Sequence, residues 1–204
     1  MGIAERKARE KQEMRTKIIQ AAQEMFVELG YDKTSIRKVA DRIEYSPATI
    51  YLYFKNKDDL FFEIHELLFN QLAENLRKTD PIEHPIERLR DMGRRYIQFG
   101  MENPMYYDLM FIARAPMNAI HEEESWECAF ETFDVLEKTV KDGIDQGYLR
   151  DMDPGVLSFT VWSHVHGMVS LYLRDRMKMF PPEIQIPLMN QSLDTMLDML
   201  QCKP

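Results

Sequence analysis

Cysteine, glycine and proline are sparse in this sequence of 204 residues, and long apolar runs are missing from it. The two cysteines, Cys128 and Cys202, have no metal-ligand spacing, and free thiols are typical of a reducing cytoplasm. The 8 glycines and 10 prolines are too few for a fibrous or disordered chain. The sequence has no run of about 18 apolar residues, the length that a membrane span needs. The first 17 residues are polar and lack the apolar core of a secretory signal. We therefore expect a cytoplasmic globular protein.

Motifs of helical metalloenzymes and of nucleotide-binding enzymes are also missing. The sequence has no Glu-x-x-His pair for a di-iron site, no His-Glu-x-x-His zinc motif and no Gly-rich phosphate loop. His164 and His166 are two residues apart, which on a helix turns their side chains about 200° away from each other, so they cannot share a metal. We expect no catalytic residue, metal or cofactor, and an all-helical enzyme is the distant alternative.

The charge is unevenly distributed along the chain. The formal net charge is −8, but residues 1–60 hold 12 Lys and Arg against 10 Asp and Glu, a net of +2. The remainder holds 14 against 24, a net of −10. A mildly basic first part carried by an acidic body fits a nucleic-acid-binding end, although an excess of +2 is small.

Apolar residues recur at helical spacing along nearly the whole chain, which predicts an all-α fold of about nine helices and no sheet. The first helix should end at Gly30, the second should be capped by Thr34 or Ser35, and the third by Ser46 with Pro47 in its first position. The later helices are predicted from near Lys57, over 89–99, 105–112 and 122–147, from Pro154 to Pro181, and at the C-terminus.

Residues 34–54 carry the clearest functional pattern, two short helices separated by the brief turn Glu44-Tyr45. In the second helix Ile50 and Phe54 are four apart and should face the core. The opposite face carries small, hydroxylated and aromatic groups, which suit the major groove of DNA. These are Ala48, Thr49, Tyr51 and Leu52. An ordinary helical hairpin in an unrelated bundle would have the same spacing.

The same stretch resembles the N-terminal domain of TetR-family repressors over about residues 12–65. The matching positions are Phe26 to Tyr31, Thr34-Ser35-Ile36, Val39-Ala40, Ser46, Thr49-Ile50-Tyr51, Tyr53-Phe54 and Lys57. One departure is Glu44, where the family usually has glycine, and a side chain there costs about 1 kcal/mol if the backbone is left-handed. The resemblance implies a helix-turn-helix domain in residues 1–56 and a ligand-binding and dimerisation domain in residues 57–204.

The resemblance also implies a set of DNA contacts. Thr34 or Ser35 should hold a phosphate at the start of the second helix, and Arg37 either reads a guanine edge or is an ordinary exposed arginine. The full set is Thr34, Ser35, Arg37, Ser46, Pro47, Ala48, Thr49, Tyr51, Leu52, Tyr53 and Lys57, with the two tyrosines and Lys57 on phosphates. The base-facing residues are poor in hydrogen-bond donors, so we expect readout through thymine methyls and DNA shape. The first 17 residues form either a DNA-tracking arm or a solvated helical extension.

The last two predicted helices carry apolar residues at alternating spacings of four and three, which is typical of packed bundles. These are Phe159, Trp162, His166, Val169 and Leu173, then Ile186, Met189, Leu193, Met196 and Leu200. Ser163, Gly167 and Ser170 form a strip of small residues that a second helix could approach closely. We expect a homodimer through these two helices, which would present two recognition helices to a palindromic operator. Packing within one protomer is the alternative.

Trp162, His166 and Gly167, together with Glu102-Asn103-Pro104, resemble one TetR-family C-terminal domain type that has a Trp-His-Gly signature. This resemblance implies a regulatory domain that receives a ligand. Soft and aromatic residues suit a small apolar or aromatic effector, although core packing is the alternative for each of them. The candidates are Met105, Met110, Phe111, Trp126, Phe130, Phe133, Trp162 and His166.

These patterns together predict a bacterial DNA-binding transcription regulator, a repressor that a small effector releases from a palindromic operator. A ligand-independent dimeric regulator and an activator are the alternatives.

Overall fold

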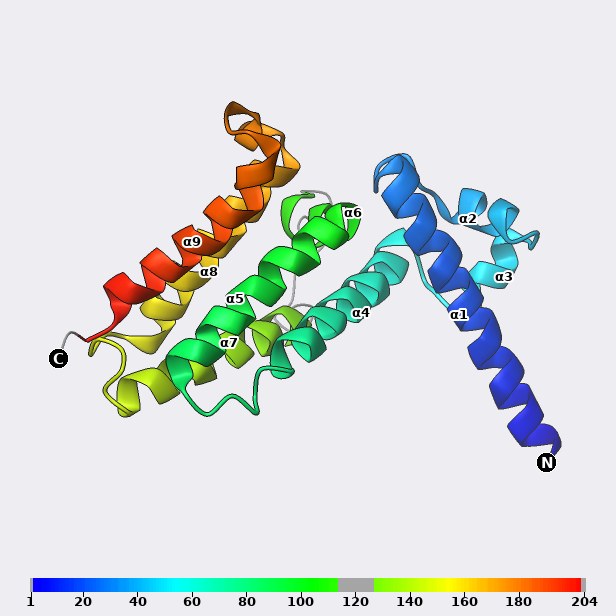
Figure 1. Ribbon diagram of the computed structural model, residues 1–204. Helices are drawn as coiled ribbons and strands as arrows, with labels where there is room; N and C mark the ends of the chain where they lie inside the picture. The colour runs from blue at the N-terminus through cyan, green and yellow to red at the C-terminus, as the bar shows by residue number, and fades with distance from the viewer. Residues whose placement is uncertain (1, 114–126, 203–204) are drawn as a thin grey trace. The chain divides into compact units, whose positions relative to one another are not determined.

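The computed structural model describes residues 2–113 and 127–202 (Figure 1). This part of the chain is all-α, as the sequence predicts, and contains nine α-helices with one π-helical and one 3-10 segment. The elements are α1 (Ile3–Leu29), α2 (Ile36–Arg42), α3 (Pro47–Tyr51), α4 (Lys57–Arg77), α5 (Pro85–Glu102), α6 (Pro104–Tyr107), η1 (Asp108–Ile112), α7 (Glu127–Asp145), α8 (Pro154–Leu173), η4 (Arg176–Met179) and α9 (Pro182–Leu200). None of these helices has the length and apolar content that crossing a membrane requires.

The described residues fall into two compact units. The first lies within Met1–Leu68 and Met105–Glu127, and the second within Phe69–Pro104 and Cys128–Pro204. Helix α4 contributes residues to both, and the chain passes between the units again at Pro104–Met105 and at Glu127–Cys128.

The core of the first unit forms where α2 packs on α1 and α3 packs on α2. Ile18, Ala22 and Phe26 of α1 are buried, at spacings of four that place them on one face. Gly30 ends α1 with φ of 80°, a conformation that favours glycine. Phe61 of α4 packs edge-on against Phe26, with ring centroids 5.4 Å apart, and so holds the start of α4 against α1.

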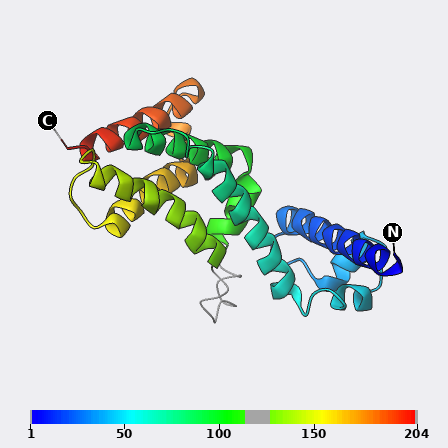
Figure 2. The same ribbon diagram turned by 90° about the horizontal axis from the view of Figure 1, so that it is seen from below.

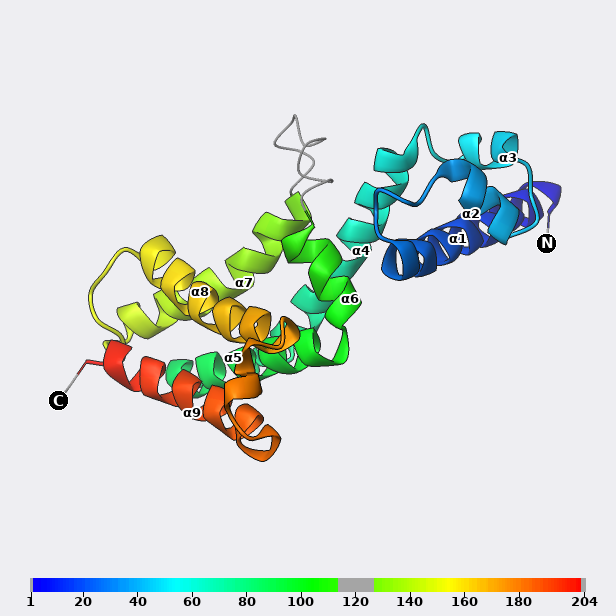
Figure 3. The ribbon, with the colours of Figure 1, turned by 90° about the horizontal axis from the view of Figure 1, so that it is seen from above.

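The second unit is built around α5, α8 and α9, which contact one another pairwise (Figure 3). Gly93 of α5 allows α9 to approach, since a Cβ there would lie 2.7 Å from a methyl of Leu193. Val161 and Val165 of α8 are buried four residues apart, which sets the inner face of that helix. At the surface, Arg90 of α5 donates to Asp194 of α9 at 2.8 Å, which joins these two helices.

Four boundaries differ from those that the sequence predicts. Helix α3 ends at Tyr51, so Phe54, predicted to lie on the same helix as Ile50, comes three residues after its end. Helix α8 ends at Leu173 instead of continuing to Pro181, because Asp175 is left-handed with φ of 59° and the chain then forms η4. The predicted sixth helix is a short α6 that continues as the π-helical η1. The predicted start of the seventh helix near Glu122 lies outside the described residues, in which α7 begins at Glu127.

Candidate nucleic-acid interface and effector site

Two serines cap the N-termini of the two helices of the helix-turn-helix. Ser35 precedes α2, and its hydroxyl accepts a hydrogen bond from the Lys38 backbone N–H at 3.3 Å. Ser46 precedes α3 and accepts from the Thr49 backbone N–H at 3.3 Å, with Pro47 in the first helical position. Ile50 is fully buried and anchors α3 to the core. These local signals, all readable in the sequence, fix which side of α3 faces outward.

The outward side of α3 and the residues just after it are strongly exposed. Leu52 is 78% exposed and Tyr51 is 56% exposed, and Ala48 is also exposed. Pro47, Thr49 and Tyr53 are half-buried, and the Thr49 hydroxyl lies 3.0 Å from that of Ser46. Leucine at this exposure costs free energy in water, because its apolar surface stays hydrated. An apolar side chain held out in this way is suited to contact with another apolar surface, such as thymine methyl groups.

The turn between α2 and α3 carries backbone strain. Glu44 has φ of 62°, one of two non-glycine residues with positive φ in the described chain. For a residue with a Cβ this conformation costs about 1 kcal/mol. The exposed carboxylate lies beside Tyr45, which is itself partly exposed. Glu44, which stands where the family usually has glycine, therefore has the left-handed backbone conformation and its steric cost.

The structure separates the two candidates for a phosphate at the start of α2. Thr34 is 2% exposed, and its hydroxyl donates to the carbonyl oxygens of Met25 at 3.1 Å and Gly30 at 2.9 Å. Ser35 is exposed, and so is Arg37 on the first turn of α2. Of the two hydroxyl groups, only that of Ser35 faces solvent.

Lys57, the predicted phosphate contact at the start of α4, is held against Tyr31. Its ammonium group donates to the Tyr31 carbonyl oxygen at 3.0 Å and lies 3.8 Å from the centre of the Tyr31 ring. The Tyr31 hydroxyl in turn bonds to Asp58. A phosphate contact would use the remaining N–H groups of an ammonium that the protein already orients.

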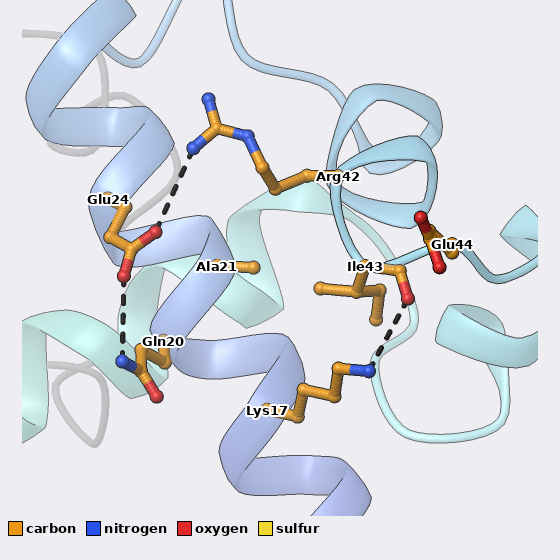
Figure 4. Close-up of a pocket in the computed structure, with 7 residues that line it drawn as sticks. All are labelled: Lys17, Gln20, Ala21, Glu24, Arg42, Ile43 and Glu44. Atoms are coloured by element: carbon orange, nitrogen blue, oxygen red, sulfur yellow. Dashed lines mark hydrogen bonds and ion pairs between the residues drawn. The ribbon is translucent and has the colours of Figure 1, made fainter.

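A shallow groove lies between α1 and the end of α2 (Figure 4). Charged groups of both signs line it: Lys17 points to the Ile43 carbonyl oxygen at 3.5 Å, and Arg42 pairs with Glu24 at 3.8 Å. Arg42 also pairs with Glu28 at 2.7 Å, which lowers the pKa of that carboxyl group by a direct hydrogen bond. The groove is therefore polar and internally neutralised, which does not suit an apolar effector.

The candidate effector residues fall in different units. Met105, Met110 and Phe111 belong to the first, where Met110 is buried and Phe111 packs on Tyr107 with ring centroids 4.9 Å apart. Phe130, Phe133, Trp162 and His166 belong to the second, and Trp126 lies outside the described residues. In the second unit Phe133 and Phe159 both contact the Trp162 ring edge-on, at 6.1 and 6.0 Å. Phe130 is 60% exposed.

A polar relay runs through this aromatic cluster, and its central residue is Tyr96 of α5. The Trp162 indole N–H donates to the Tyr96 hydroxyl oxygen at 3.2 Å, and that hydroxyl lies 3.2 Å from Nδ1 of His166. The indole can only donate, so the Tyr96 oxygen accepts from it, and the direction of the Tyr96–His166 hydrogen bond follows from the tautomer of the imidazole. The other ring nitrogen of His166, Nε2, lies 3.4 Å from the Ser170 hydroxyl. Burial lowers the pKa of His166, which keeps the imidazole neutral at pH 7.

Helical periodicity places Tyr96 in the helix predicted over 89–99 and gives no sign of this role. The one available signal is chemical, because a buried tyrosine hydroxyl needs a hydrogen-bond partner. Which partner it finds depends on the approach of α8 to α5, about seventy positions away in sequence, and no local pattern encodes that.

Within the first unit, His65 of α4 connects to η1. The His65 side chain is 3% exposed, and its Nε2 lies 3.3 Å from the Met110 carbonyl oxygen. Burial lowers the pKa of His65 to about 4, although the bond to the carbonyl opposes this effect. The residue is therefore neutral at pH 7 and joins α4 to a π-helical segment, an element often found at functional positions.

The last two helices carry an exposed face that overlaps only in part with the seam predicted from the sequence. Val169, Met189 and Leu193 of that seam are buried within the protomer, where they pack α8, α9 and α5 together. Periodicity identified them as apolar but not which neighbour they contact. Phe159 of that seam is exposed, and it shares the exposed side of α8 with Val156, Thr160, Ser163 and Leu171.

Two family models match the chain. The model of bacterial regulatory proteins of the tetR family matches residues 18–64, and that of the tetracyclin repressor-like C-terminal domain matches residues 89–200. The second match alone spans more than half of the chain. The protein therefore belongs to the TetR family of bacterial regulatory proteins and is a DNA-binding transcriptional regulator.

Individual relatives agree with this assignment. The chain is 39% identical over 79 residues to the HTH-type transcriptional regulator HbdR of Aromatoleum sp. (strain CIB), covering 38% of this chain and 34% of HbdR. It is 26% identical over 172 residues to the uncharacterized HTH-type transcriptional regulator YhgD of Bacillus subtilis, covering 81% and 85%. The fold matches that of the fatty acid degradation regulator FadR from Bacillus halodurans with a TM-score of 0.72, at 17% identity and over 88% and 93% of the two chains.

Proposed function

We propose that this protein is a homodimeric repressor that binds a palindromic operator and is released from it by a small apolar or aromatic effector. The observation that carries the DNA-binding part is the outward face of α3, where Leu52 and Tyr51 are held in solvent by the burial of Ile50. The match to a tetracyclin repressor-like C-terminal domain favours repression over activation.

In the operator complex, α3 would lie in the major groove, where Pro47, Ala48, Thr49 and Leu52 face bases and thymine methyl groups. The Tyr51 and Tyr53 hydroxyls, Lys57 and the Ser35 cap would contact phosphates and so set the register of the protein on the duplex. Arg37 would add a bidentate contact to a guanine. Ser46 would act mainly by positioning α3, because its hydroxyl already bonds to Thr49.

Dimerisation would bring two such units to the two half-sites of the palindrome. The exposed face of α8 supports this, since Val156, Phe159 and Leu171 are each more than half exposed in the protomer. Between them, Ser163 and Gly167 would allow close approach of the α8 helix of a second copy. Covering this apolar face would remove it from water.

The effector would bind against the aromatic cluster of the second unit. Phe133 and Trp162 offer ring surfaces, and the relay from Tyr96 to His166 offers a small number of polar groups beside them. A neutral imidazole favours a neutral or weakly polar ligand group over a phosphate. Of the other candidates, Phe130 lies on the same helix as Phe133 and would cover one side of the ligand, whereas Met105, Met110, Phe111 and Trp126 remain candidates from the sequence alone.

Release from DNA requires that the effector bind better to a form whose recognition helices are wrongly spaced for the operator, because only differential affinity shifts an equilibrium. Helix α4 would carry the change, since it belongs to both units. The His65 contact with Met110 would bring η1 into the same movement.

Selection of bound fragments from the source genome, followed by affinity titration at two salt concentrations, tests the DNA-binding proposal. The expected result is one palindromic sequence, bound by two protomers with an affinity that falls steeply with salt. No enrichment by folded, dimeric protein that has been stripped of small molecules would contradict it.

Effector binding has its own test. A Trp126→Phe variant leaves Trp162 as the only tryptophan, so its fluorescence reports directly on the aromatic cluster. Apolar and aromatic compounds that lower operator affinity should also change this emission, with the same midpoint for both effects. A compound that dissociates the operator complex without changing Trp162 emission would place the effector elsewhere. If no compound affects operator binding, the protein is a ligand-independent regulator.

A further inference from the structure

Only the second half of α1 takes part in the core. Buried positions begin at Ile18, whereas residues 4–13, here called the N-terminal extension, are all exposed. Figure 2 shows the N-terminal part of α1 continuing past α3. An unsupported helix of this length is marginal in water. It is capped by Glu5, which accepts from the Gly2 backbone N–H at 2.7 Å.

Most basic residues at this end of α1 have an acidic or aromatic partner. Arg6 pairs with Glu10 at 3.4 Å and Arg9 with Glu13 at 3.5 Å, each four residues along the helix. The Arg15 guanidinium lies 2.6 Å from the Glu63 carboxylate. Both glutamates of the extension beyond the cap are thereby neutralised by arginines.

Lys17 has contacts of another kind, since its ammonium lies 4.9 Å from the Tyr45 ring centre and reaches the Ile43 carbonyl (Figure 4). Lys7 and Lys11 are different. Within the described residues no carboxylate lies within ion-pair distance of either, and both are exposed. They are therefore the two basic groups of α1 that are ready to bind an anion.

The spacing puts these two lysines in line with the recognition helix. Lys7, Lys11 and Arg15 are each four residues apart, so they share one face of α1. On that face the Arg15 guanidinium lies 5.5 Å from the ring centre of Phe54, which follows α3 by three residues. The line of cations thus begins beside the α3 segment and continues outward along α1.

We propose that Lys7 and Lys11 bind phosphates of the operator backbone next to the half-site that α3 reads. This inference rests on the proposed operator binding. The two residues are separated by about 6 Å along the helix axis, and each strand of B-DNA presents a phosphate about every 3.4 Å. Both ammonium groups can therefore reach one strand.

The composition of the extension favours DNA over other partners. Alanine is the only apolar residue type between positions 4 and 13, so the extension has no surface for an apolar protein groove or for the interior of a bilayer. Phosphate contacts made here would add affinity without reading sequence. Operator and random duplexes should therefore gain equally from them.

The test compares wild type with a Lys7→Ala/Lys11→Ala variant and with a charge-matched Arg6→Ala/Arg9→Ala control. Affinity is measured for the selected operator and for a random duplex over a range of salt concentrations. Two lysines in each of two protomers release about four counterions, so the lysine variant should lose about 3 to 4 from the slope of log affinity against log salt. The control should lose less than about 1, because its arginines are paired. Alanine is a stronger helix former than lysine, so the variant keeps its helix.

Each outcome decides the proposal. A selective loss of slope, equal on both duplexes, together with the loss of ethylation-sensitive phosphates flanking the half-site, supports it. An unchanged slope, or an equal loss in the arginine control, overturns it while leaving operator binding by α3 intact. Absence of binding of the wild type to either duplex would overturn both this proposal and the proposed function.

Discussion

The imidazole of His65 in α4 donates its Nε2–H to the carbonyl oxygen of Met110 in η1, over 3.3 Å, from a position that is 3% exposed. A buried donor without a partner would cost free energy, so this bond satisfies the imidazole in its neutral form. Protonation would place a charge in the same low-dielectric site, which is why burial lowers the pKa of His65 to about 4.

The stability of the first unit should therefore depend on pH through His65. In the unfolded chain a histidine takes up its proton near pH 6.5, whereas in the folded chain His65 does so only at about pH 4. Between these values the unfolded state binds more protons, so the free energy of unfolding should decrease by about 3 kcal/mol as the pH falls from 6.5 to 4. Above pH 6.5 the contribution is fully present.

Urea denaturation of wild type and His65→Gln across this range measures the effect. Glutamine keeps a donor for the Met110 carbonyl but does not titrate. The difference in unfolding free energy between the two proteins should shrink or reverse as the pH decreases toward 4. Parallel curves for both proteins over the whole range would show that His65 is not the responsible group.

Glu44 provides a second prediction, based on its φ of 62° in the turn before α3. Replacing it by glycine removes the steric cost of the left-handed backbone, but it also makes the unfolded chain more flexible. We expect a net increase of about 0.5 to 1 kcal/mol in the free energy of unfolding. Glu44→Ala is the matched control, because it removes the carboxylate and keeps the Cβ. If both variants gain equally, the charge of Glu44 and not its backbone conformation is the cause.

The features that the sequence predicted are those with a local physical cause. Gly30 ends α1 because glycine accepts positive φ, and Ser46 with Pro47 begins α3 because both residues favour a helix N-terminus. The inward direction of Ile50 follows from its place on the apolar side of α3, and Phe54, which lies three residues after the end of that helix, is also buried. Such signals act within a few residues, so one sequence is enough to read them.

Features that depend on the packing of distant helices could not be read in this way. Val169 and Leu193 have the same spacing whether they pack inside the protomer or between protomers, and they are buried inside it. The relay from Trp162 through Tyr96 to His166 requires α5 and α8 to meet in one particular register. The position at which α8 ends could not be predicted either, because an aspartate and not a glycine adopts the left-handed conformation at position 175.

Tyr51 offers a direct test of phosphate contact. Its ring is 56% exposed on the outward side of α3, so removing the hydroxyl group in Tyr51→Phe should leave the free energy of unfolding nearly unchanged. A lost hydrogen bond to a charged phosphate should weaken operator binding by about 1.5 kcal/mol or more per protomer. Tyr45→Phe is the control, since Tyr45 is also exposed but precedes the recognition helix and keeps its ring against Lys17. Equal operator affinities for wild type and Tyr51→Phe, measured by fluorescence anisotropy, would exclude the contact.

Gly167 distinguishes the proposed dimer from packing within one protomer. A Cβ built on this residue would meet no heavy atom within 4 Å in the protomer, so a side chain can leave the backbone there without a clash at its Cβ. In a helix interior, replacing glycine even favours folding, by up to about 1 kcal/mol for alanine. A second α8 helix that packs closely on Gly167 would by contrast collide with a leucine side chain. Gly167→Leu should therefore give a folded monomer, with operator binding weakened because only one half-site is held at a time.

Sedimentation velocity and thermal unfolding of the same samples separate the two effects. Lys138→Leu places an equal apolar group on the exposed surface of α7 and should leave the dimer intact. Gly167→Ala, with a much smaller side chain, should weaken association less than leucine does. A Gly167→Leu protein that sediments as a dimer with unchanged operator affinity would show that the α8 face around Gly167 is not the contact surface, and that the exposed side chains of Val156, Phe159 and Leu171 have another role.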